Sequence, residues 1–311
     1  MNYLRLVAAL LAVASVGGCV SPSTLVPPSN LQAPAQVADV TVGQRDLIYM
    51  PPPPAPIPVA VYNFADQTGQ MKLSETTQSF SRAVTQGATS ILVGALRNAG
   101  NGSWFTVIER ERLDNVLRER QIIREMRSQY LKERETPPEV LPSLLFAGLT
   151  LEGGIISYDT NVQTGGLGAR FLGIGGSTQY RTNTATVYLR AVSVKTGEVL
   201  LNVVTQKKVS SVSMSGGVFK FVEFDELLQG EVGVTANEPM QLAIQGAIER
   251  AVYALILEGG EPGPRQLWQF ADQGAGEQWL SRYRAERKRS LADAFKDGPP
   301  LPVAQAEQVS P

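Results

Sequence analysis

Polar and apolar residues alternate along residues 162–234, and this stretch has no sustained helical periodicity. In Ser177–Thr184 every second residue is strongly polar and the others are Thr or Tyr, while Ser211 and Ser213 alternate with Val212 and Met214. Successive strand side chains point to opposite faces, so these segments are predicted to be two-faced strands. Their less polar faces are too small to build a thick core. Periodicity alone favours an antiparallel sheet with one solvated face, but strands that line a water-filled barrel also fit.

A second kind of strand interrupts this stretch. Thr186–Val194 and Glu198–Thr205 predict a hairpin that turns at Lys195–Gly197. These two segments hold larger apolar residues than their neighbours, which is typical of a packed soluble sheet. Strands of two kinds therefore alternate along the chain.

The pattern on either side of this stretch predicts a mixture of helices and further strands. Buried strands are predicted at 59–64, 104–108 and 146–158. Helices are predicted at 84–98, 109–133, 239–257 and 277–295, and an apolar docking segment at 265–270. In the third helix the residues expected to face inward are Leu242, Ile248, Val252 and Ile256. Gly259 and Gly260 are expected to end that helix.

The N-terminal residues predict export and lipid attachment. Arg5, an apolar run and small residues up to Gly18 form a secretory signal, and Cys19 follows in a context that resembles a bacterial lipobox, where the thiol is acylated. Val20 replaces the Asp that retains lipoproteins at the inner membrane, so the predicted location is the outer membrane, facing the periplasm. Residues 19–58 are rich in Pro and are predicted to be an extended strap between the lipid anchor and the folded domain.

The candidate chemistry excludes most enzyme classes. The chain has no His and a single Cys, which removes the commonest general base and the usual zinc ligands. Its net charge of -1 gives no general affinity for nucleic acid. The glycine-rich residues 165–176 do not complete a dinucleotide-binding motif, and Glu223 with Asp225 are interpreted as surface charges. We therefore predict no catalytic residue, no metal site and no cofactor.

Several separated motifs carry a family resemblance. They are the lipobox, Val61–Phe64 with Asp66–Gln70, Gly165–Gly175, and Gln229–Gly233 with Asn237–Pro239. Together they resemble the curli secretion channel, a family of outer-membrane lipoproteins that exports amyloid fibre subunits. The likeness runs from Cys19 to about Phe270, and the tail after Gln273 is not part of it.

The resemblance implies an α/β (α+β) periplasmic domain with two transmembrane β-hairpins per protomer that join a shared β-barrel in a ring of nine protomers. Four strands cannot close a wide barrel alone, so oligomerisation must remove the open edges. The second hairpin is expected to turn near Phe221–Asp225. The implied organisation begins with a signal peptide at 1–18 and the strap at 19–58. A periplasmic domain follows at 59–161, with a constriction loop at 71–80, and then membrane hairpins at 162–184 and 209–234, separated by a soluble hairpin at 185–208. The chain ends with a helix and docking segment at 235–272 and a charged, disordered tail at 273–311.

The resemblance also implies roles for individual residues. Phe80 matches the family's ring-forming Phe, the family's Tyr has no counterpart, and Gln78 or Ser79 stands where an Asn is expected. The predicted constriction residues are Ser74, Gln78, Ser79 and Phe80. The residues predicted to face the lumen are Gln179, Arg181, Asn183, Ser211, Ser213, Gln229 and Glu231. The residues predicted to face lipid are Tyr180, Val212, Met214, Leu228 and Val232.

The implied function is export of unfolded curli subunits from the periplasm by diffusion without ATP. The implied partners are further copies of the chain in a homo-nonamer, the fibre subunits, periplasmic and surface accessory proteins, and the outer membrane, with no nucleic acid. The alternative is a monomeric periplasmic lipoprotein that activates a cell-wall synthase as a binding module. Whether the acylated protein forms a large conducting ring separates the two.

Overall fold

The computed structural model describes residues 39–69, 85–165, 178–214, 218–222 and 239–294. The chain divides into two compact units, Met1–Val40 and Thr41–Pro311. Every helix and strand described below belongs to the second unit. The predicted signal peptide and Cys19 lie outside the described residues.

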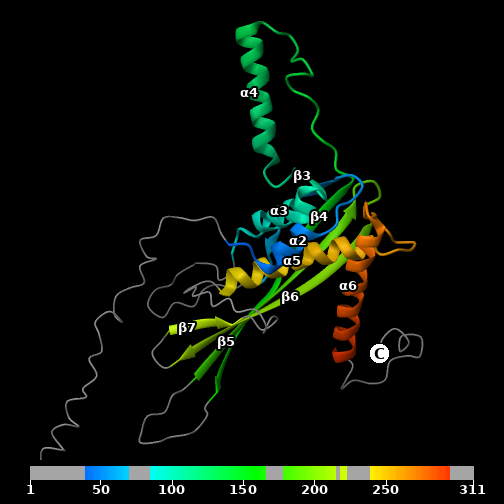
Figure 1. Ribbon diagram of the computed structural model, residues 1–311. Helices are drawn as coiled ribbons and strands as arrows, with labels where there is room; N and C mark the ends of the chain where they lie inside the picture. The colour runs from blue at the N-terminus through cyan, green and yellow to red at the C-terminus, as the bar shows by residue number, and fades with distance from the viewer. Residues whose placement is uncertain (1–38, 70–84, 166–177, 215–217, 223–238, 295–311) are drawn as a thin grey trace, which may run out of the picture. The chain divides into compact units, whose positions relative to one another are not determined.

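A mixed sheet forms the centre of the second unit (Figure 1). Its strands lie in the order β3 (Phe105–Glu109), β1 (Ile57–Val61), β4 (Leu149–Gly165), β5 (Thr178–Ser193), β6 (Val199–Met214) and β7 (Val218–Val222), and β2 (Ala65–Asp66) pairs with β4 off this path. Strand β1 runs parallel to β3 and β4, whereas β4 to β7 are antiparallel. The mixed α/β class predicted from the sequence is confirmed.

Strands β4, β5 and β6 are much longer than the strands predicted from the sequence. The turn predicted at Lys195–Gly197 is confirmed between β5 and β6, and Gly197 has the positive φ of 73° that favours glycine. However, β5 runs without a break across the boundary predicted at residue 185. The two kinds of strand in the sequence are therefore two halves of the same strands, because one ladder of hydrogen bonds continues through both.

The second hairpin turns earlier than predicted. Met214 pairs with Val218, and β7 runs back along Ser210–Met214. The predicted turn near Phe221–Asp225 is wrong, because Phe221 already lies in the returning strand, opposite Ser211. The residues between the two strands read Ser-Gly-Gly, which are common turn formers.

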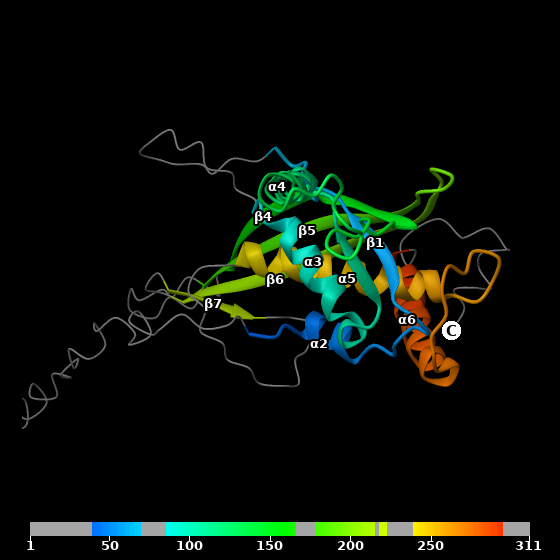
Figure 2. The same ribbon diagram turned by 90° about the horizontal axis from the view of Figure 1, so that it is seen from above.

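Helices α3 (Ala88–Asn98) and α5 (Pro239–Gly260) lie side by side on one face of the sheet (Figure 2). The predicted inward residues Ile248, Val252 and Ile256 of α5 are fully buried, but Leu242 is 39% exposed and that prediction is wrong. The predicted stop at Gly259 and Gly260 is confirmed, since α5 ends at Gly260. Gly259 and Gly260 lie within α5, where their missing side chains admit the rings of Trp268 and Phe270.

The predicted strap contains a helix, α2 (Val42–Tyr49). The hydroxyl of Thr41 caps it by accepting from the amide of Gln44 at 3.0 Å, and Leu47 and Met50 are buried in the core. The indole of Trp104 donates to the Pro51 carbonyl at 2.8 Å, which fixes the chain after the helix. The extended strap predicted at 19–58 is therefore wrong for its last part, because apolar residues there reach the core.

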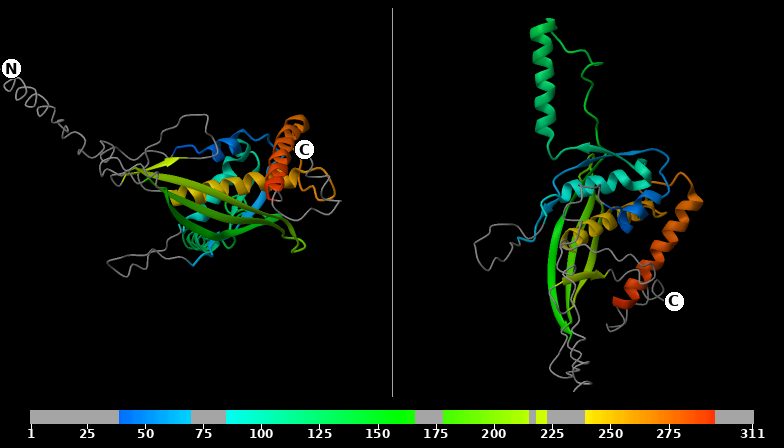
Figure 3. Two further views of the ribbon diagram at one scale, coloured as in Figure 1. Left: turned by 90° about the horizontal axis from the view of Figure 1, so that it is seen from below. Right: turned by 60° about the vertical axis from the view of Figure 1, so that its left-hand side comes forward.

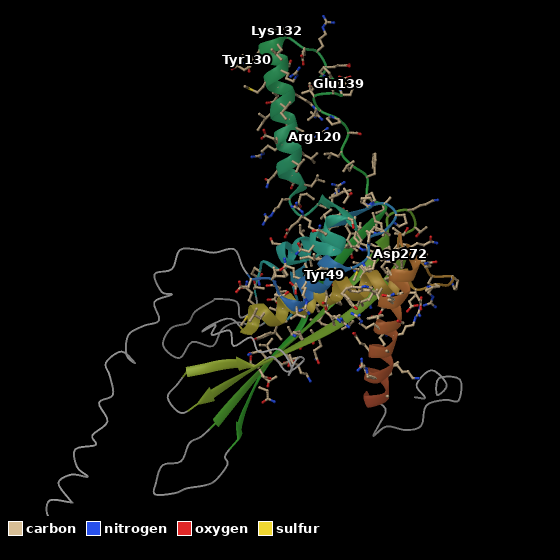
Figure 4. The ribbon with its side chains drawn as sticks, in the orientation of Figure 1. Tyr49, Arg120, Tyr130, Lys132, Glu139 and Asp272 are labelled. Carbon is tan, nitrogen blue, oxygen red and sulfur yellow. The ribbon has the colours of Figure 1, made fainter. Side chains whose placement is uncertain are left out.

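The two charged helices differ from each other. No residue of α4 (Leu113–Leu131) is buried, and Arg120, labelled in Figure 4, donates to the Pro142 carbonyl of the extended segment that returns to β4. Helix α6 (Gln273–Ala294), shown from two further sides in Figure 3, buries Leu280 and Tyr283. The helix predicted at 277–295 is confirmed, and the disorder predicted for all of 273–311 is wrong for this helix. Residues 295–311 lie outside the described residues.

Candidate functional site

The stem of the predicted constriction loop is held by the sheet. After β1 the chain makes the two-residue strand β2, in which Ala65 and Asp66 pair with Gly154 and Ile155 of β4. The amide of Gln67 then donates to the Ile155 carbonyl at 2.9 Å. The loop therefore leaves the domain from a hydrogen-bonded strand.

Side-chain hydrogen bonds join the two ends of this loop. One oxygen of Asp66 accepts from the amide and hydroxyl of Thr68 at 3.0 and 2.7 Å, and the other accepts from the side-chain amide of Gln86 at 3.3 Å. The side-chain amide of Gln67 donates to the Tyr188 hydroxyl of β5 at 3.0 Å. Asp66 thus connects the residues that enter and leave the loop, and Gln67 connects the loop to the long strands.

Phe64 anchors the stem to α3 and β4. Its amide donates to the hydroxyl of buried Thr89 in the first turn of α3 at 2.9 Å. Its ring is 2% exposed and rests on Gly153 of β4, where an added Cβ would lie 2.4 Å from the ring. No local sequence pattern reveals this contact, because Gly153 and Phe64 are far apart in the chain. The Gly153–Gly154 pair within a strand was the available signal.

The predicted constriction residues Ser74, Gln78, Ser79 and Phe80 lie outside the described residues. Their roles stay predictions. The stem that carries them is described, and it lies beside β4 and β5, the strands that continue into the predicted membrane segment.

The strand register groups the predicted lumen and lipid residues. Gln179 is paired with Ser213 and Arg181 with Ser211, all predicted to face the lumen. Tyr180 is paired with Val212, both predicted to face lipid. Met214 pairs with Val218 at the end of β6. The remaining residues of the two sets, Gln229, Glu231, Leu228 and Val232, lie outside the described residues.

Asn183 does not fit its predicted exposure to water. It is 2% exposed, and its carbonyl oxygen accepts from the hydroxyls of Tyr158 and Thr160 at 2.8 and 2.9 Å. Its side-chain nitrogen has no hydrogen-bond partner among the described residues. The prediction is wrong for this residue because Asn183 lies at the domain end of the alternating segment, beside buried Ala185 and Val209.

A buried carboxylate that sequence reasoning missed lies on α5. Glu249 is 4% exposed and accepts from the Thr41 hydroxyl at 2.5 Å and from the Gln245 side chain at 2.9 Å. Burial raises the pKa of Glu249 above its ordinary value, although these two hydrogen bonds and the charge of Lys207 oppose the shift. An added Cβ on Gly43 would lie 2.6 Å from a carboxylate oxygen, so a side chain there would have to displace that of Glu249. Glu249 thus fastens the start of α2 to α5.

The described residues add neither a metal site nor a membrane-spanning helix to this site. No group of three or more His, Cys, Asp or Glu side chains in these ranges is arranged to hold a metal ion. None of the helices described is both long and apolar enough to cross a membrane.

Comparison with known proteins places this architecture in a family. Residues 41–282 match the family described as curli production assembly/transport component CsgG. The chain belongs to the CsgG family. It is 40% identical over 266 residues to the CsgG component of Salmonella typhimurium, across 85% of this chain and 92% of the relative. It has the same identity over the same length to the CsgG component of Escherichia coli K12, 91% of which is covered.

The CsgG family match also revises one predicted limit. The likeness was expected to end near residue 273, but the match runs to residue 282, within α6. Among solved structures, the chain resembles the hypothetical protein CT253 from Chlamydia trachomatis at 14% identity and a TM-score of 0.33, over 66% of this chain and 97% of that one.

Proposed function

We propose that this chain is an outer-membrane secretion channel that exports unfolded curli subunits from the periplasm to the cell surface. The observation that carries the proposal is membership of the CsgG family, with 40% identity over 85% of the chain to relatives named as curli production assembly/transport components. The partners are further copies of the chain in a ring of nine, the fibre subunits, and accessory proteins on either side of the membrane.

The four strands β4 to β7 are the proposed membrane segments. Strand β4 pairs antiparallel with β5, and β6 with β7, and the far halves of β4, β5 and β6 continue the register of the domain sheet. A membrane strand needs about 9–11 residues, and an open sheet edge is not tolerated in lipid. Neighbouring copies therefore pair their hairpins into one barrel, and Cys19 adds a lipid anchor.

The proposed function is passage of a polypeptide through the constriction and involves no catalysis. Phe80, with Gln78, Ser79 and Ser74, narrows the bore, and a ring of small contacts lets an unfolded polar chain pass without strong binding. The stem formed by Asp66, Gln67 and Phe64 keeps the loop at a constant position relative to β4 and β5. No nucleotide is needed, because the exported chain moves down its own gradient.

The experiment is single-channel recording on acylated protein extracted from the outer membrane in detergent. The proposal predicts a large ring that conducts ions in planar bilayers. Phe80→Ala should raise the unit conductance, because the largest side chain of the loop is removed. Phe146→Ala, an exposed Phe outside the loop and the strands, is the matched control and should leave the bore unchanged. A soluble monomer without conductance would contradict the proposal and favour the periplasmic binding module.

A further inference from the structure

Strand β3 leaves one edge of the sheet open in the domain. It is the terminal strand of the order and pairs only with β1 among the described strands. The amide of Ile57 donates to the Trp104 carbonyl at 2.8 Å, so in this parallel ladder Thr106 and Ile108 also direct their backbone groups to β1. The backbone groups of Phe105, Val107 and Glu109 therefore point to the open edge.

A groove runs beside this edge. Helix α3 lines one wall with Thr89, Val93 and Arg97, which are spaced four residues apart and share one helix face. Strand β3 lines the other wall with Phe105, Val107 and Glu109, spaced two apart on one strand face. The groove has a volume of about 400 Å³. A helix face and an open strand edge around one groove form the arrangement that accepts an added peptide strand.

The groove has opposite charges at its two ends. Arg97 lies at the end where β3 begins, is exposed, and makes no ion pair with any described residue. Glu109 and Glu111 lie at the other end. Glu109 accepts from the Arg112 amide at 2.8 Å and Glu111 from the Thr89 hydroxyl at 3.2 Å, so both carboxylates are held near the groove by hydrogen bonds.

We propose that this groove binds an extended polypeptide segment of another protein by strand addition to β3. The segment runs antiparallel to β3, with a basic side chain beside Glu109 and Glu111, an apolar side chain between Val93 and Val107, and an acidic side chain beside Arg97. Main-chain hydrogen bonds to Phe105 and Val107 give affinity, and the charged ends select the direction. The site does not depend on whether the chain forms a channel.

Charge argues against the described segment 142–147 as the occupant. Among the described residues, segment 142–147 most resembles an unpaired strand, because it is extended and its Leu145 and Phe146 are 61% and 88% exposed. Its sequence is Pro-Ser-Leu-Leu-Phe-Ala, which contains no charged residue, so it has no side chain to pair with Arg97 at one end of the groove or with Glu109 and Glu111 at the other. One acceptor of the edge is already used, because Arg110 donates to the Glu109 carbonyl at 2.9 Å. Phe105 and Val107 therefore supply the main-chain contacts.

The test uses a fluorescein-labelled, end-capped peptide that reads Lys-Thr-Val-Thr-Val-Thr-Glu, and its binding to the full-length protein by anisotropy. We expect it to bind at least about fivefold more tightly than the same composition in reverse order, since the reverse order places like charges together in the antiparallel register and matches the charges only in the less stable parallel register. Arg97→Glu should weaken binding about tenfold, and a peptide ending in Lys should recover it on that variant. Equal affinity for both peptide orders, or no effect of Arg97→Glu, would overturn the proposal.

Two further variants test the groove and the edge separately. Val93→Arg fills the groove from α3 and should abolish binding, while Ser90→Arg, exposed on the same helix, should not. Val107→Pro removes an edge amide that the β1 ladder does not use, so it should also abolish binding. Far-ultraviolet circular dichroism must match the parent for each variant. Unchanged binding in the folded Val93→Arg variant would overturn the proposal.

A second copy of this chain is the competing occupant. The same peptide is added to the detergent-extracted oligomer and to the monomer obtained by dilution, and the assembly state of each is measured by light scattering. Binding to both species supports the proposal. Binding to the monomer alone, with the oligomer unable to bind, would show that another copy covers the edge and would overturn it.

Discussion

The two halves of strand β5 share one ladder of backbone hydrogen bonds but differ in the side chains that they carry. In the domain half, Ala185, Val187, Leu189 and Ala191 are fully buried against the helical layer. In the far half, the sequence alternates Gln179 and Arg181 with less polar residues, and the strands extend beyond α5 (Figure 1). Hydrogen bonding therefore does not distinguish the halves. The environment that each half requires is set by its side chains, and this is the basis of the proposed membrane role of the far half.

The largest expected effect comes from the buried half. Leu189→Ala removes a fully buried side chain, and we expect a loss of about 2–5 kcal/mol in the free energy of unfolding, because a cavity remains. Thr184→Ala, a half-buried position of the same strand outside the core, should cost less than about 1 kcal/mol. Urea unfolding followed by Trp fluorescence measures both. Equal losses would contradict the core packing described for the domain half.

A smaller effect is expected where the sheet meets the loop stem. Gly153→Ala forces a methyl group against the Phe64 ring and the Tyr188 carbonyl, so we expect a loss of about 1–3 kcal/mol and a displaced stem. Gly148→Ala, where an added Cβ meets no atom within 4 Å, is the matched control. The ion conductance of the Gly153→Ala protein should change as well as its stability. A stable variant with parental conductance would show that Phe64 does not position the loop.

The smallest effect concerns the dependence of stability on pH. The pKa of Glu249 is raised in the folded chain, so the folded state holds this proton more tightly than the unfolded state. The stability from this group is therefore fully present below the unfolded pKa of about 4.3 and is lost as the pH rises through the folded pKa. Glu249→Gln should remove that loss and gain stability relative to the parent as the pH rises.

Urea midpoints for the parent and Glu249→Gln between acidic and neutral pH measure this difference. Gln245→Ala serves as a control, since it removes one hydrogen bond to the carboxylate but keeps the titrating group. A constant difference between parent and Glu249→Gln over the whole range would contradict the assignment of this titration to Glu249.

The sequence predicted those features that depend on local patterns. Alternation predicted the hairpin around Gly197, and apolar periodicity predicted the inward face of α5 through Ile248 and Val252. Tertiary contacts explain the misses. Gly259 and Gly260 end α5 as local rules predict, but those rules do not give the Trp268 ring that packs against Gly259. Asn183 reads as a solvated strand residue, but Tyr158 from β4 covers it.

The loop stem shows the same limit of local patterns. Asp66 and Gln86 are twenty positions apart, and Gln67 meets Tyr188 only after β4 and β5 have paired. None of these contacts leaves a periodic signal. The motif resemblance could assign a role to Phe80, but the means by which the domain holds its loop required the structure.

Export of an unfolded polypeptide by this chain alone tests the central claim most directly. Purified acylated protein is reconstituted into liposomes as the only protein, an unfolded curli subunit is added outside without nucleotide, and the fraction protected from external protease is measured over time. The proposed channel predicts protected subunit that accumulates with time and depends on the reconstituted ring, with Phe80→Ala accelerating entry. No protected subunit above that in empty liposomes, from protein shown to be assembled in the membrane, would contradict the account.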